Sequence, residues 1–456
     1  MTQTVYDVLD ELNSTAMSSA EKGSRFEKLI AAYLKADPTF AEQFSDVYLW
    51  QDWPGRGGRH DTGIDLVAVD RQSGLDVAIQ CKFYGRESTI SKPDIDSFLS
   101  ASGKQGFAER IIFSTTDKWN LHAEETIKGQ AIPVRRVGMA ALEASPVDWG
   151  HFQLSSPDVL VLADRKVVRP HQQVAIDDVL AGFATRDRGK LIMACGTGKT
   201  FTALRLAEQL VGAGGSVLFL VPSIALMSQS LREWSTEADV PLAPVAICSD
   251  ARVTRKKAAD EDISSVDLAL PATTNPERVR TRIADAREQQ NRMTVVFCTY
   301  QSIDAVAQAQ TPDGAGFDLV ICDEAHRTTG VTLTGDDESA FVRVHDADYL
   351  RAAKRLYMTA TPRIYDDNAK TKAGEANAVL ASMDDEQLFG PEFHRLGFGD
   401  AVGAGLLTDY KVLVLAVDEV SVATTFQSQL SDENHELKLD DAAKIVGCWN
   451  GLPNAG

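Results

Sequence analysis

The stretch Met193-Ala194-Cys195-Gly196-Thr197-Gly198-Lys199-Thr200 decides the fold of this chain. It follows an apolar segment at 190–193 and precedes a segment at 201–211 that has helical periodicity. A glycine-bearing turn that ends in Gly-Lys-Thr between a strand and a helix typically binds nucleotide phosphates through backbone N–H groups and a lysine. We therefore predict that Lys199 neutralises phosphate charge, that Thr200 binds Mg²⁺, and that the phosphates are lined by the N–H groups of Gly196, Thr197, Gly198 and Lys199.

A second motif supplies the acids that such a phosphate site needs. Asp323-Glu324-Ala325-His326 follows an apolar segment at 319–322, which places two carboxylates at the end of a predicted strand. We predict that Asp323 holds the Mg²⁺ shell and that Glu324 orients or deprotonates the attacking water. Two solvated acids are the simpler alternative, but they would not explain the apolar strand before them. The two motifs together predict a protein that uses ATP and Mg²⁺.

Strand-like and helix-like segments alternate between about 165 and 395. Strands are predicted at 190–193, 216–221, 245–248, 294–299, 319–322 and 356–359. This alternation predicts an α/β fold in which a parallel sheet carries helices on both faces. Since phosphate sites in such sheets lie at the carboxyl ends of strands, both motifs fall where the fold would hold a nucleotide. One further strand is predicted at 410–417.

Charge and composition narrow the choice of partners. The formal net charge of −19 argues against non-specific nucleic-acid binding by the whole surface, but it leaves room for a local basic track. Basic residues cluster at 252–257 and 351–355, and each cluster is either a DNA contact or a solvated face. The six cysteines have no metal-ligand spacing, which indicates reduced thiols. Because the sequence has no apolar run of about 18 residues and no evident secretory signal, we expect a cytoplasmic protein without a membrane span.

Residues 1–150 are predicted to form a smaller α/β domain with a second candidate site. Asp65 lies on one predicted strand, 64–69, and Gln80 ends the next, with Lys82 two residues later. Alternate residues of a strand point to the same face, so Gln80 and Lys82 would share one face. A hairpin in register would bring Asp65 to them, around one metal ion and one phosphate.

Glu27 would add another carboxylate to this site from a helix predicted to begin near Ser24. The alternative is an ordinary hairpin with a surface aspartate and lysine. Residues 144–158, which contain two prolines and few apolar repeats, are predicted to form a linker.

The motor motifs resemble those of superfamily 2 helicases and translocases. Asp-Glu-Ala-His at 323–326 and Thr-Ala-Thr-Pro at 359–362 are similar to motifs II and III of that superfamily. The resemblance implies that His326 belongs to the nucleotide site and that Thr359 and Thr361 have a coupling role. Arg169-Pro170-His171-Gln172 resembles the adenine-reading element, with Gln172 as the side chain that reads the base edge.

Three short segments resemble the motifs with which superfamily 2 motors contact the nucleic-acid backbone. Hydroxyls and main-chain N–H groups suit such contacts, which do not depend on base sequence. The resemblance implies DNA-binding roles for Pro222, Ser223, Thr273, Thr274, Thr299, Tyr300 and Gln301. The threonine pair is the least specific of these segments, since such pairs are common in loops.

The N-terminal pattern resembles the PD-(D/E)xK nucleases, and within them the Mrr-like restriction branch. The residues that carry this resemblance are Gly63-Ile64-Asp65 and Ile79-Gln80-Cys81-Lys82. In that branch glutamine often replaces the second acid, and a helical glutamate contributes. The resemblance therefore implies that Asp65 and Gln80 bind the metal, that Lys82 is catalytic, and that Glu27 assists them.

A nuclease followed by a motor resembles the N-terminal half of Type ISP restriction–modification enzymes, which are single-polypeptide Type I enzymes. The resemblance implies an ATP-dependent translocase on double-stranded DNA that is coupled to a Mg²⁺-dependent endonuclease. It divides the chain into a nuclease domain at 1–150, a linker at 151–164, a first RecA-like lobe at 165–395 and the incomplete start of a second lobe at 396–456.

The resemblance also implies partners. No Asn-Pro-Pro-Tyr motif is present, so methyltransferase and target-recognition domains are expected beyond residue 456 or in another chain. The arginines with which the second lobe reaches the γ-phosphate are expected there too, so ATP turnover by residues 1–456 alone should be slow.

Three other interpretations remain open at this point. The first is a defence or repair helicase–nuclease without a methyltransferase. The second is a nucleotide-switched DNA-binding module whose nuclease-like domain only grips DNA. The third is an RNA helicase, which the nuclease-like domain argues against.

The nuclease assignment predicts that Asp65→Ala or Lys82→Ala abolishes DNA cleavage, because the first removes a metal ligand and the second removes the cation that stabilises developing negative charge. ATP binding should be unchanged in both variants. Plasmid cleavage and nucleotide-binding assays on the same preparations check this. Persistent cleavage by both variants would remove the assignment.

Overall fold

The computed structural model describes residues 3–58, 63–103, 106–249, 267–310, 316–333, 341–366 and 378–409. The chain divides into two compact units, Met1–Phe398 and Gly399–Gly456. The predicted strand at 410–417 and the basic cluster at 252–257 lie outside the described residues. None of the described helices has the length and apolarity needed to cross a bilayer.

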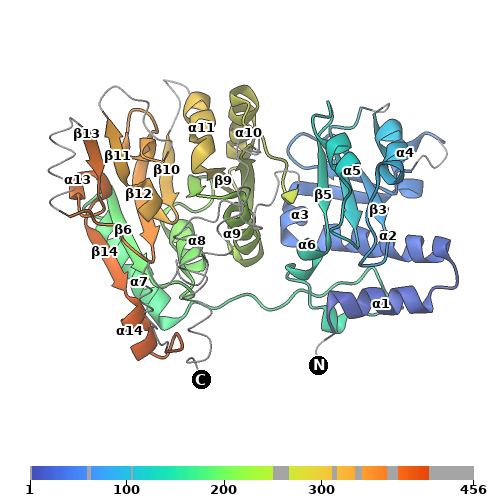
Figure 1. Ribbon diagram of the computed structural model, residues 1–456, viewed down its shortest axis with the longest axis horizontal. Helices are drawn as coiled ribbons and strands as arrows, with labels where there is room; N and C mark the ends of the chain where they lie inside the picture. Colours follow the sequence, from blue (N-terminus) through green and yellow to red (C-terminus); the bar gives the residue numbers. More distant parts are fainter. Residues whose placement is uncertain are drawn as a thin grey trace, which may run out of the picture. The chain divides into compact units, whose positions relative to one another are not determined.

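The N-terminal part of the first unit is built on a mixed five-stranded sheet (Figure 1). Its strands, which adjoin in sequence order, are β1 (Phe44–Leu49), β2 (Leu66–Asp70), β3 (Asp76–Lys82), β4 (Glu109–Ser114) and β5 (Val134–Val137). β2 is antiparallel to β1 and β3, whereas β3, β4 and β5 run parallel. Leu66 pairs with Ile79 and Val69 with Asp76, so the predicted hairpin forms.

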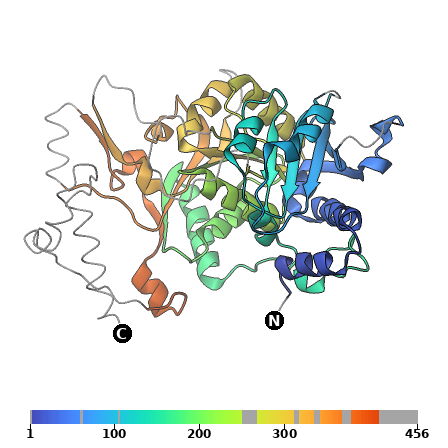
Figure 2. The ribbon, with the colours of Figure 1, turned by 45° about the vertical axis from the view of Figure 1, so that its right-hand side comes forward.

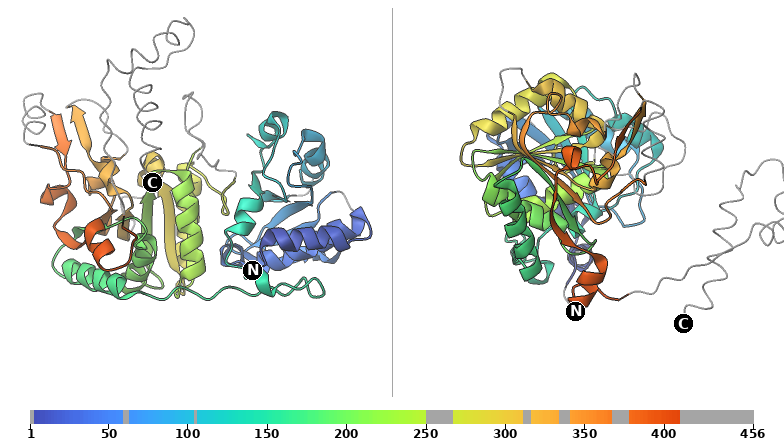
Figure 3. Two further views of the ribbon diagram at one scale, coloured as in Figure 1. Left: turned by 60° about the horizontal axis from the view of Figure 1, so that its bottom comes forward. Right: turned by 90° about the vertical axis from the view of Figure 1, so that its left-hand side faces the viewer.

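Helices cover both faces of this sheet. The helices are α1 (Val5–Thr15), α2 (Ser19–Ala36), α3 (Pro38–Gln43), α4 (Lys92–Ser102), α5 (Leu121–Ile127) and α6 (Met139–Glu143). The helices flank the sheet in Figure 3. Ile79 of β3 packs with α1 and α2 on one face, and its neighbour Ala78 packs with α4 and α5 on the other. α2 begins five residues before the predicted Ser24, because the Ser18 hydroxyl accepts a hydrogen bond from Glu21 N and caps it.

Part of the segment predicted as a linker is packed. A 3₁₀ turn spans Trp149–His151, and Val147, Trp149 and Phe152 are buried in the main apolar cluster. Val147 also forms a β-bridge with Leu162. The apolar side chains hold this stretch against the core despite the prolines that predicted an open connection. Two further 3₁₀ turns of the N-terminal part span Trp50–Asp52 and Pro54–Arg56.

A seven-stranded sheet forms the second part of this unit, and every neighbouring pair of strands is parallel. The parallel α/β prediction is therefore confirmed. The spatial order is β14 (Glu392–Leu396), β6 (Arg188–Met193), β12 (Ala352–Thr359), β10 (Phe317–Cys322), β7 (Ser216–Val221), β9 (Met293–Thr299) and β8 (Leu242–Ile247).

Helices lie on both faces of this sheet as well (Figure 2). Phe219 of β7 packs against Trp234 on one face, whereas Leu218 and Leu220 pack with Ile283 and Ile303 on the other. The helices are α7 (Pro170–Phe183), α8 (Lys199–Leu210), α9 (Ile224–Glu237), α10 (Pro276–Glu288), α11 (Ile303–Ala309) and α13 (Glu386–Phe389).

Smaller elements complete the described chain. β11 (Gly330–Leu333) and β13 (Ala378–Ala381) form an antiparallel pair. Three 3₁₀ turns span Tyr300–Ser302, Ala325–Thr328 and Arg343–His345. The last described helix, α14 (Phe398–Gly403), begins at the final residue of the first unit.

The aromatic ring of Phe393 packs the edge strand β14 against two glycines, Gly182 of α7 and Gly189 of β6. Phe393 packs edge-on against Phe183, with ring centroids 5.1 Å apart. A Cβ atom at Gly182 or at Gly189 would overlap the Phe393 ring. These two positions therefore accept only glycine, because β14 approaches β6 and α7 too closely for a side chain.

Gly189→Ala is accordingly predicted to lower the free energy of unfolding by about 1–3 kcal/mol, the usual cost of overpacking a core. Gly399→Ala is the matched control, since a Cβ atom there meets nothing within 4 Å. Its effect should stay within about 0.5 kcal/mol, as for other uncrowded surface positions. Chemical denaturation of both variants checks this, and equal destabilisation would contradict the packing argument.

Candidate nucleotide site and candidate nuclease site

The glycine-bearing loop connects β6 directly to α8. Gly196 and Gly198 have φ angles of +80° and +85°, in the region that disfavours any side chain. Gly198 is the N-cap of α8, which begins at Lys199. The loop therefore turns sharply and places the amino end of a twelve-residue helix at the carboxyl end of β6, where backbone N–H groups favour an anion.

Hydrogen bonds inside the loop fix its shape. The Thr197 hydroxyl donates to Ala194 O at 2.7 Å, and the Lys199 ammonium donates to Met193 O at 3.2 Å. Thr200 lies in the first turn of α8, and its carbonyl accepts from the Trp234 indole at 3.0 Å. The loop is thus held by its own polar groups, with Lys199 and Thr200 at the end of the strand where the sequence predicts phosphate and Mg²⁺.

The two acids follow β10, and only β12 separates β10 from β6 in the sheet. Asp323 is 6% exposed. Its pKa is raised to about 6 by burial and by the neighbouring Glu324 carboxylate, and the Glu324 backbone N–H and Lys199 oppose that rise. Glu324 has φ +48° and is the one described non-glycine residue in the left-handed region. Such strain persists where the surroundings enforce it, and it often marks a functional turn.

The end of β12 contacts the acid motif. His326 Nδ1 lies 3.1 Å from Thr359 Oγ1 and 3.3 Å from Glu324 Oε2. Thr361 N donates to Thr359 Oγ1 at 3.1 Å. Burial lowers the pKa of His326, which favours the neutral ring. The structure therefore places the acid, the histidine and both threonines in a chain of contacts, and their coupling role stays a prediction.

Gln172 fastens the start of α7 to the nucleotide loop. Its Oε1 accepts from Arg169 N at 2.9 Å, and its Nε2 donates to Thr197 O at 3.3 Å. His171 Nε2 lies 3.0 Å from the same carbonyl. A cavity of about 320 Å³ adjoins these groups. Both ends of the Gln172 amide contact backbone, so its predicted role in reading the adenine edge remains a prediction.

The predicted DNA-contact segments follow three adjacent strands, β7, β9 and β8. Gln301 Nε2 donates to Pro222 O at 3.2 Å, which joins the first two segments. Ser223 caps α9 through Leu226 N, and Thr273 Oγ1 accepts from Asn275 N.

Some of these side chains serve the protein itself. Tyr300 is fully buried, and its hydroxyl donates to Asp323 O at 2.8 Å. Thr299 is 4% exposed and bonds Ser302. Thr274 is exposed. DNA contact at Thr299 and Tyr300 would therefore use the main chain.

In the N-terminal domain the structure brings Asp65 and Gln80 together. Asp65 N donates to Ile79 O at 2.9 Å, and Asp65 Oδ2 accepts from Cys81 N at 2.6 Å. Gln80 is 2% exposed, and its Nε2 donates to Gly63 O at 3.0 Å. Its Oε1 is buried, and no described residue forms a hydrogen bond with it. A buried acceptor of this kind is costly unless it binds a donor or a cation.

Glu27 and Lys82 lie close enough to Cys81, the residue after Gln80, for their charges to shift the pKa of its thiol. The pKa of the Cys81 thiol is raised by burial and then by the carboxylates of Asp65 and Glu27, while Lys82 opposes the rise. Within the described ranges, no three His, Cys, Asp or Glu side chains gather in a way that could hold a metal. These residues could hold a divalent cation only if the Gln80 oxygen is a third ligand, in addition to the carboxylates of Asp65 and Glu27.

Sequence patterns missed two features of these sites. The Cys81 N–H, which orients Asp65, is a backbone group and leaves no residue signature. Lys166 and Glu233, which line the cavity beside the nucleotide loop, are 67 positions apart and share no motif.

The raised pKa of Asp323 predicts a pH-dependent stability of the protein without nucleotide and Mg²⁺. Between pH 3.8 and about 6 the folded state binds more protons than the unfolded state, so the free energy of unfolding falls as pH rises. Asp323→Asn should remove this fall, which amounts to at most about 3 kcal/mol. Chemical denaturation from pH 4 to 7 checks this, and identical pH slopes for the variant and the parent would contradict it.

Two family models match the chain, one over each of its domains. A family model described as restriction endonuclease, of the Mrr type, matches residues 35–159. A model of the res subunit of Type III restriction enzymes matches residues 165–364. No curated protein matches the chain.

Solved structures give a more specific likeness. The structure of the ATP-dependent Type ISP restriction–modification enzyme LlaBIII bound to DNA is 38% identical, with a TM-score of 0.78 over 99% of this chain. The chain spans 28% of that protein's length. A nuclease-deletion mutant of the Type ISP enzyme LlaGI, in complex with a DNA substrate mimic, is 33% identical over 62% of this chain and 26% of its own, with a TM-score of 0.41. This chain therefore joins a restriction-endonuclease domain to a helicase-like ATPase domain, as the Type ISP restriction–modification enzymes do.

Proposed function

We propose that this chain supplies the ATP-driven motor and the Mg²⁺-dependent nuclease of a restriction–modification enzyme that translocates on double-stranded DNA. Two separate groups of polar side chains, one in each domain and each with a buried member, support the proposal. In one, the charge of Lys199 at the end of β6 acts on the buried Asp323 at the end of β10, one strand away. In the other, Asp65 lies opposite a buried Gln80 whose Oε1 has no hydrogen-bond partner among the described residues. The domain boundaries 1–150 and 165–395 are part of the proposal.

In the motor, the backbone of 196–199 and the Lys199 ammonium would hold the phosphates. Thr200 and Asp323 would hold Mg²⁺, whose charge offsets the cost of ionising a buried carboxyl. Glu324 would orient or deprotonate the attacking water from its left-handed turn. His326 lies within 3.3 Å of Glu324 and would connect this event to Thr359 and Thr361.

In the nuclease, Asp65 and the Gln80 oxygen would hold the metal ion, assisted by Glu27. The Cys81 N–H fixes the Asp65 carboxylate at 2.6 Å, so it does not reorganise when a cation arrives. Lys82 would stabilise negative charge that develops on the phosphate or activate the water. Bound Mg²⁺ would supply Lewis-acid activation of the phosphodiester.

DNA binding by this chain has to be local, because the net charge is −19. The segments after β7, β8 and β9 follow adjacent strands and offer Ser223, Thr274 and main-chain groups for backbone contacts. LlaBIII is described as bound to DNA, which supports this partner. Methyltransferase and target-recognition functions would then come from other domains or chains.

The proposal predicts that the motor and nuclease variants differ in their defects. Lys199→Ala should lose ATP binding, and Glu324→Gln should bind ATP while its hydrolysis falls about 10²–10⁴-fold, the usual contribution of a general base. Both should lose ATP-dependent nicking of supercoiled plasmid. Asp65→Ala is the reciprocal control, with ATP binding kept and nicking lost.

Two results would reject the proposal in different ways. Full nicking by Lys199→Ala would show that the nuclease works without the motor. No nicking by the unchanged chain with ATP and Mg²⁺, in an assay long enough to allow for its slow ATP turnover, would favour the DNA-binding module that only grips DNA.

A further inference from the structure

The cavity beside the nucleotide loop has charged residues that no motif contains. It is lined by Gly196–Gly198 of the loop, by Val167 and Phe201 as apolar walls, and by Lys166 and Glu233. A nucleoside needs apolar surface and a few placed polar groups. Both ends of the Gln172 amide are bonded to backbone groups. Lys166 and Glu233 line the same cavity and form an ion pair with each other, so we consider them as the polar groups that a nucleoside would meet.

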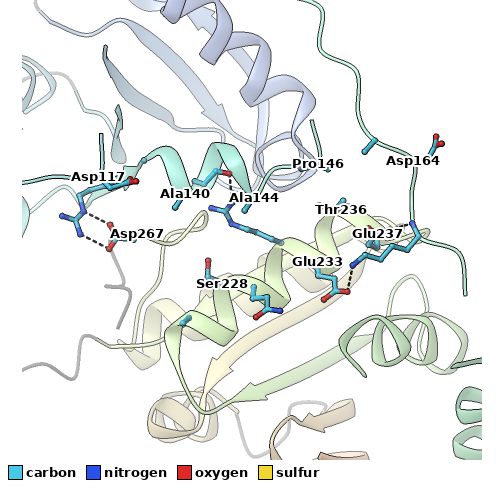
Figure 4. Close-up of a pocket in the computed structure, with 18 of the residues that line it drawn as sticks. Asp117, Ala140, Ala144, Pro146, Asp164, Ser228, Glu233, Thr236, Glu237 and Asp267 are labelled. Carbon is cyan, nitrogen blue, oxygen red and sulfur yellow. Dashed lines mark hydrogen bonds and ion pairs between the residues drawn. The ribbon is translucent and has the colours of Figure 1, made fainter. Parts of the chain in front are cut away.

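Helix α9 holds that ion pair in place. Glu233 Oε1 accepts from Lys166 Nζ at 2.8 Å, and Glu237 Oε2, one turn later, accepts from Lys166 N at 2.7 Å. Glu233 is largely shielded, with 17% of its side chain exposed. Two carboxylates on one face of α9 thus fix the segment that runs into α7. Figure 4 shows Glu233 and Glu237 on this helix.

The same ion pair borders a second cavity, of about 700 Å³, where the motor meets the nuclease domain (Figure 4). Arg232, which precedes Glu233 on α9, lines this second cavity but not the first. Its guanidinium donates to Ala141 O, on α6 of the nuclease domain, at 2.8 Å. The helix that carries Glu233 is therefore fixed to the nuclease domain at the adjacent residue.

We propose that Lys166 and Glu233 contact the nucleoside part of the bound nucleotide, and that Arg232 is a positioning residue which holds them through its bond to the nuclease domain. The inference rests on the proposed function, since it assumes ATP as the fuel. Glu233 would accept a hydrogen bond from a nucleoside donor, either the exocyclic amine of adenine or a ribose hydroxyl. Through this bond the nuclease domain would help to position the nucleotide site.

The test compares ATP with inorganic triphosphate, which has the same phosphate chain without base or sugar. Binding of both to the full chain is measured with Mg²⁺ by calorimetry or competition. Glu233→Gln and Arg232→Met are each expected to weaken ATP binding at least about fivefold, the lower range of energetic coupling between sites. Triphosphate binding should be unchanged. Arg395→Met, which breaks the exposed ion pair with Glu392, is the matched control and should alter neither.

Analogues locate the donor. Purine riboside triphosphate lacks the exocyclic amine, and 2′,3′-dideoxy-ATP lacks the ribose hydroxyls. The analogue whose binding no longer responds to Glu233→Gln lacks the group that Glu233 contacts. Continued response of both analogues to Glu233→Gln would overturn the contact.

Other outcomes separate this inference from the proposed function. Unchanged ATP binding in Glu233→Gln would overturn the inference and leave the motor assignment intact. Equal weakening of ATP and triphosphate would also overturn it, because the loop itself would then be damaged. If Arg232→Met unfolds, Arg232→Lys keeps the charge and should retain part of the ATP affinity. Failure of the unchanged chain to bind either compound would reject the proposed function.

Discussion

The burial of the Asp323 carboxyl is the constraint on which the motor site depends. This carboxyl is 6% exposed and lies beside a second acid, so it resists ionisation, and its pKa is raised to about 6. The site can hold a negative charge there only if cations stand opposite it. Lys199 meets part of this need from the end of β6, and a divalent metal would meet the rest. The parallel sheet makes this possible, because it aligns the ends of β6 and β10 with one strand between them.

A second constraint is the shared core of the two domains. One buried apolar cluster contains Tyr33 and Phe40 of the nuclease domain together with Trp234 and Leu242 of the motor. Polar contacts surround it, including the ion pair of Arg136 with Asp267 at 2.6 Å and the bond of Arg232 to Ala141 O. A continuous apolar interface resists relative motion more than a polar one does. The shared core therefore favours a fixed arrangement of the two domains within the first unit.

Most strands of the motor sheet could be predicted from the sequence, because strands buried in a parallel sheet are continuous apolar segments. β7 was predicted with its observed bounds, 216–221. β8 begins at Leu242, earlier than the predicted 245, and so includes Pro244. Proline is unfavourable inside a central strand, but it is tolerated here because β8 lies at the edge of the sheet. β12 begins at Ala352 rather than 356. Its Arg355 is charged yet only 2% exposed, and it donates to Val344 O and Leu350 O, partners that lie outside any local pattern.

The two sites differ in how completely the protein alone satisfies them, and this difference bears on their order of action. In the motor, the Asp323 carbonyl, the Thr197 hydroxyl and the Gln172 amide have protein partners, and Lys199 offsets part of the charge of the Asp323 carboxyl. In the nuclease, the buried Gln80 oxygen has no hydrogen-bond partner within the part of the chain that the structure describes, and two carboxylates alone would be few ligands for a divalent cation. Phosphate oxygens of DNA would be natural additional ligands. Under the proposed function, DNA placed in the nuclease site would supply the missing ligands, and a site with few protein ligands would restrain cleavage before that point.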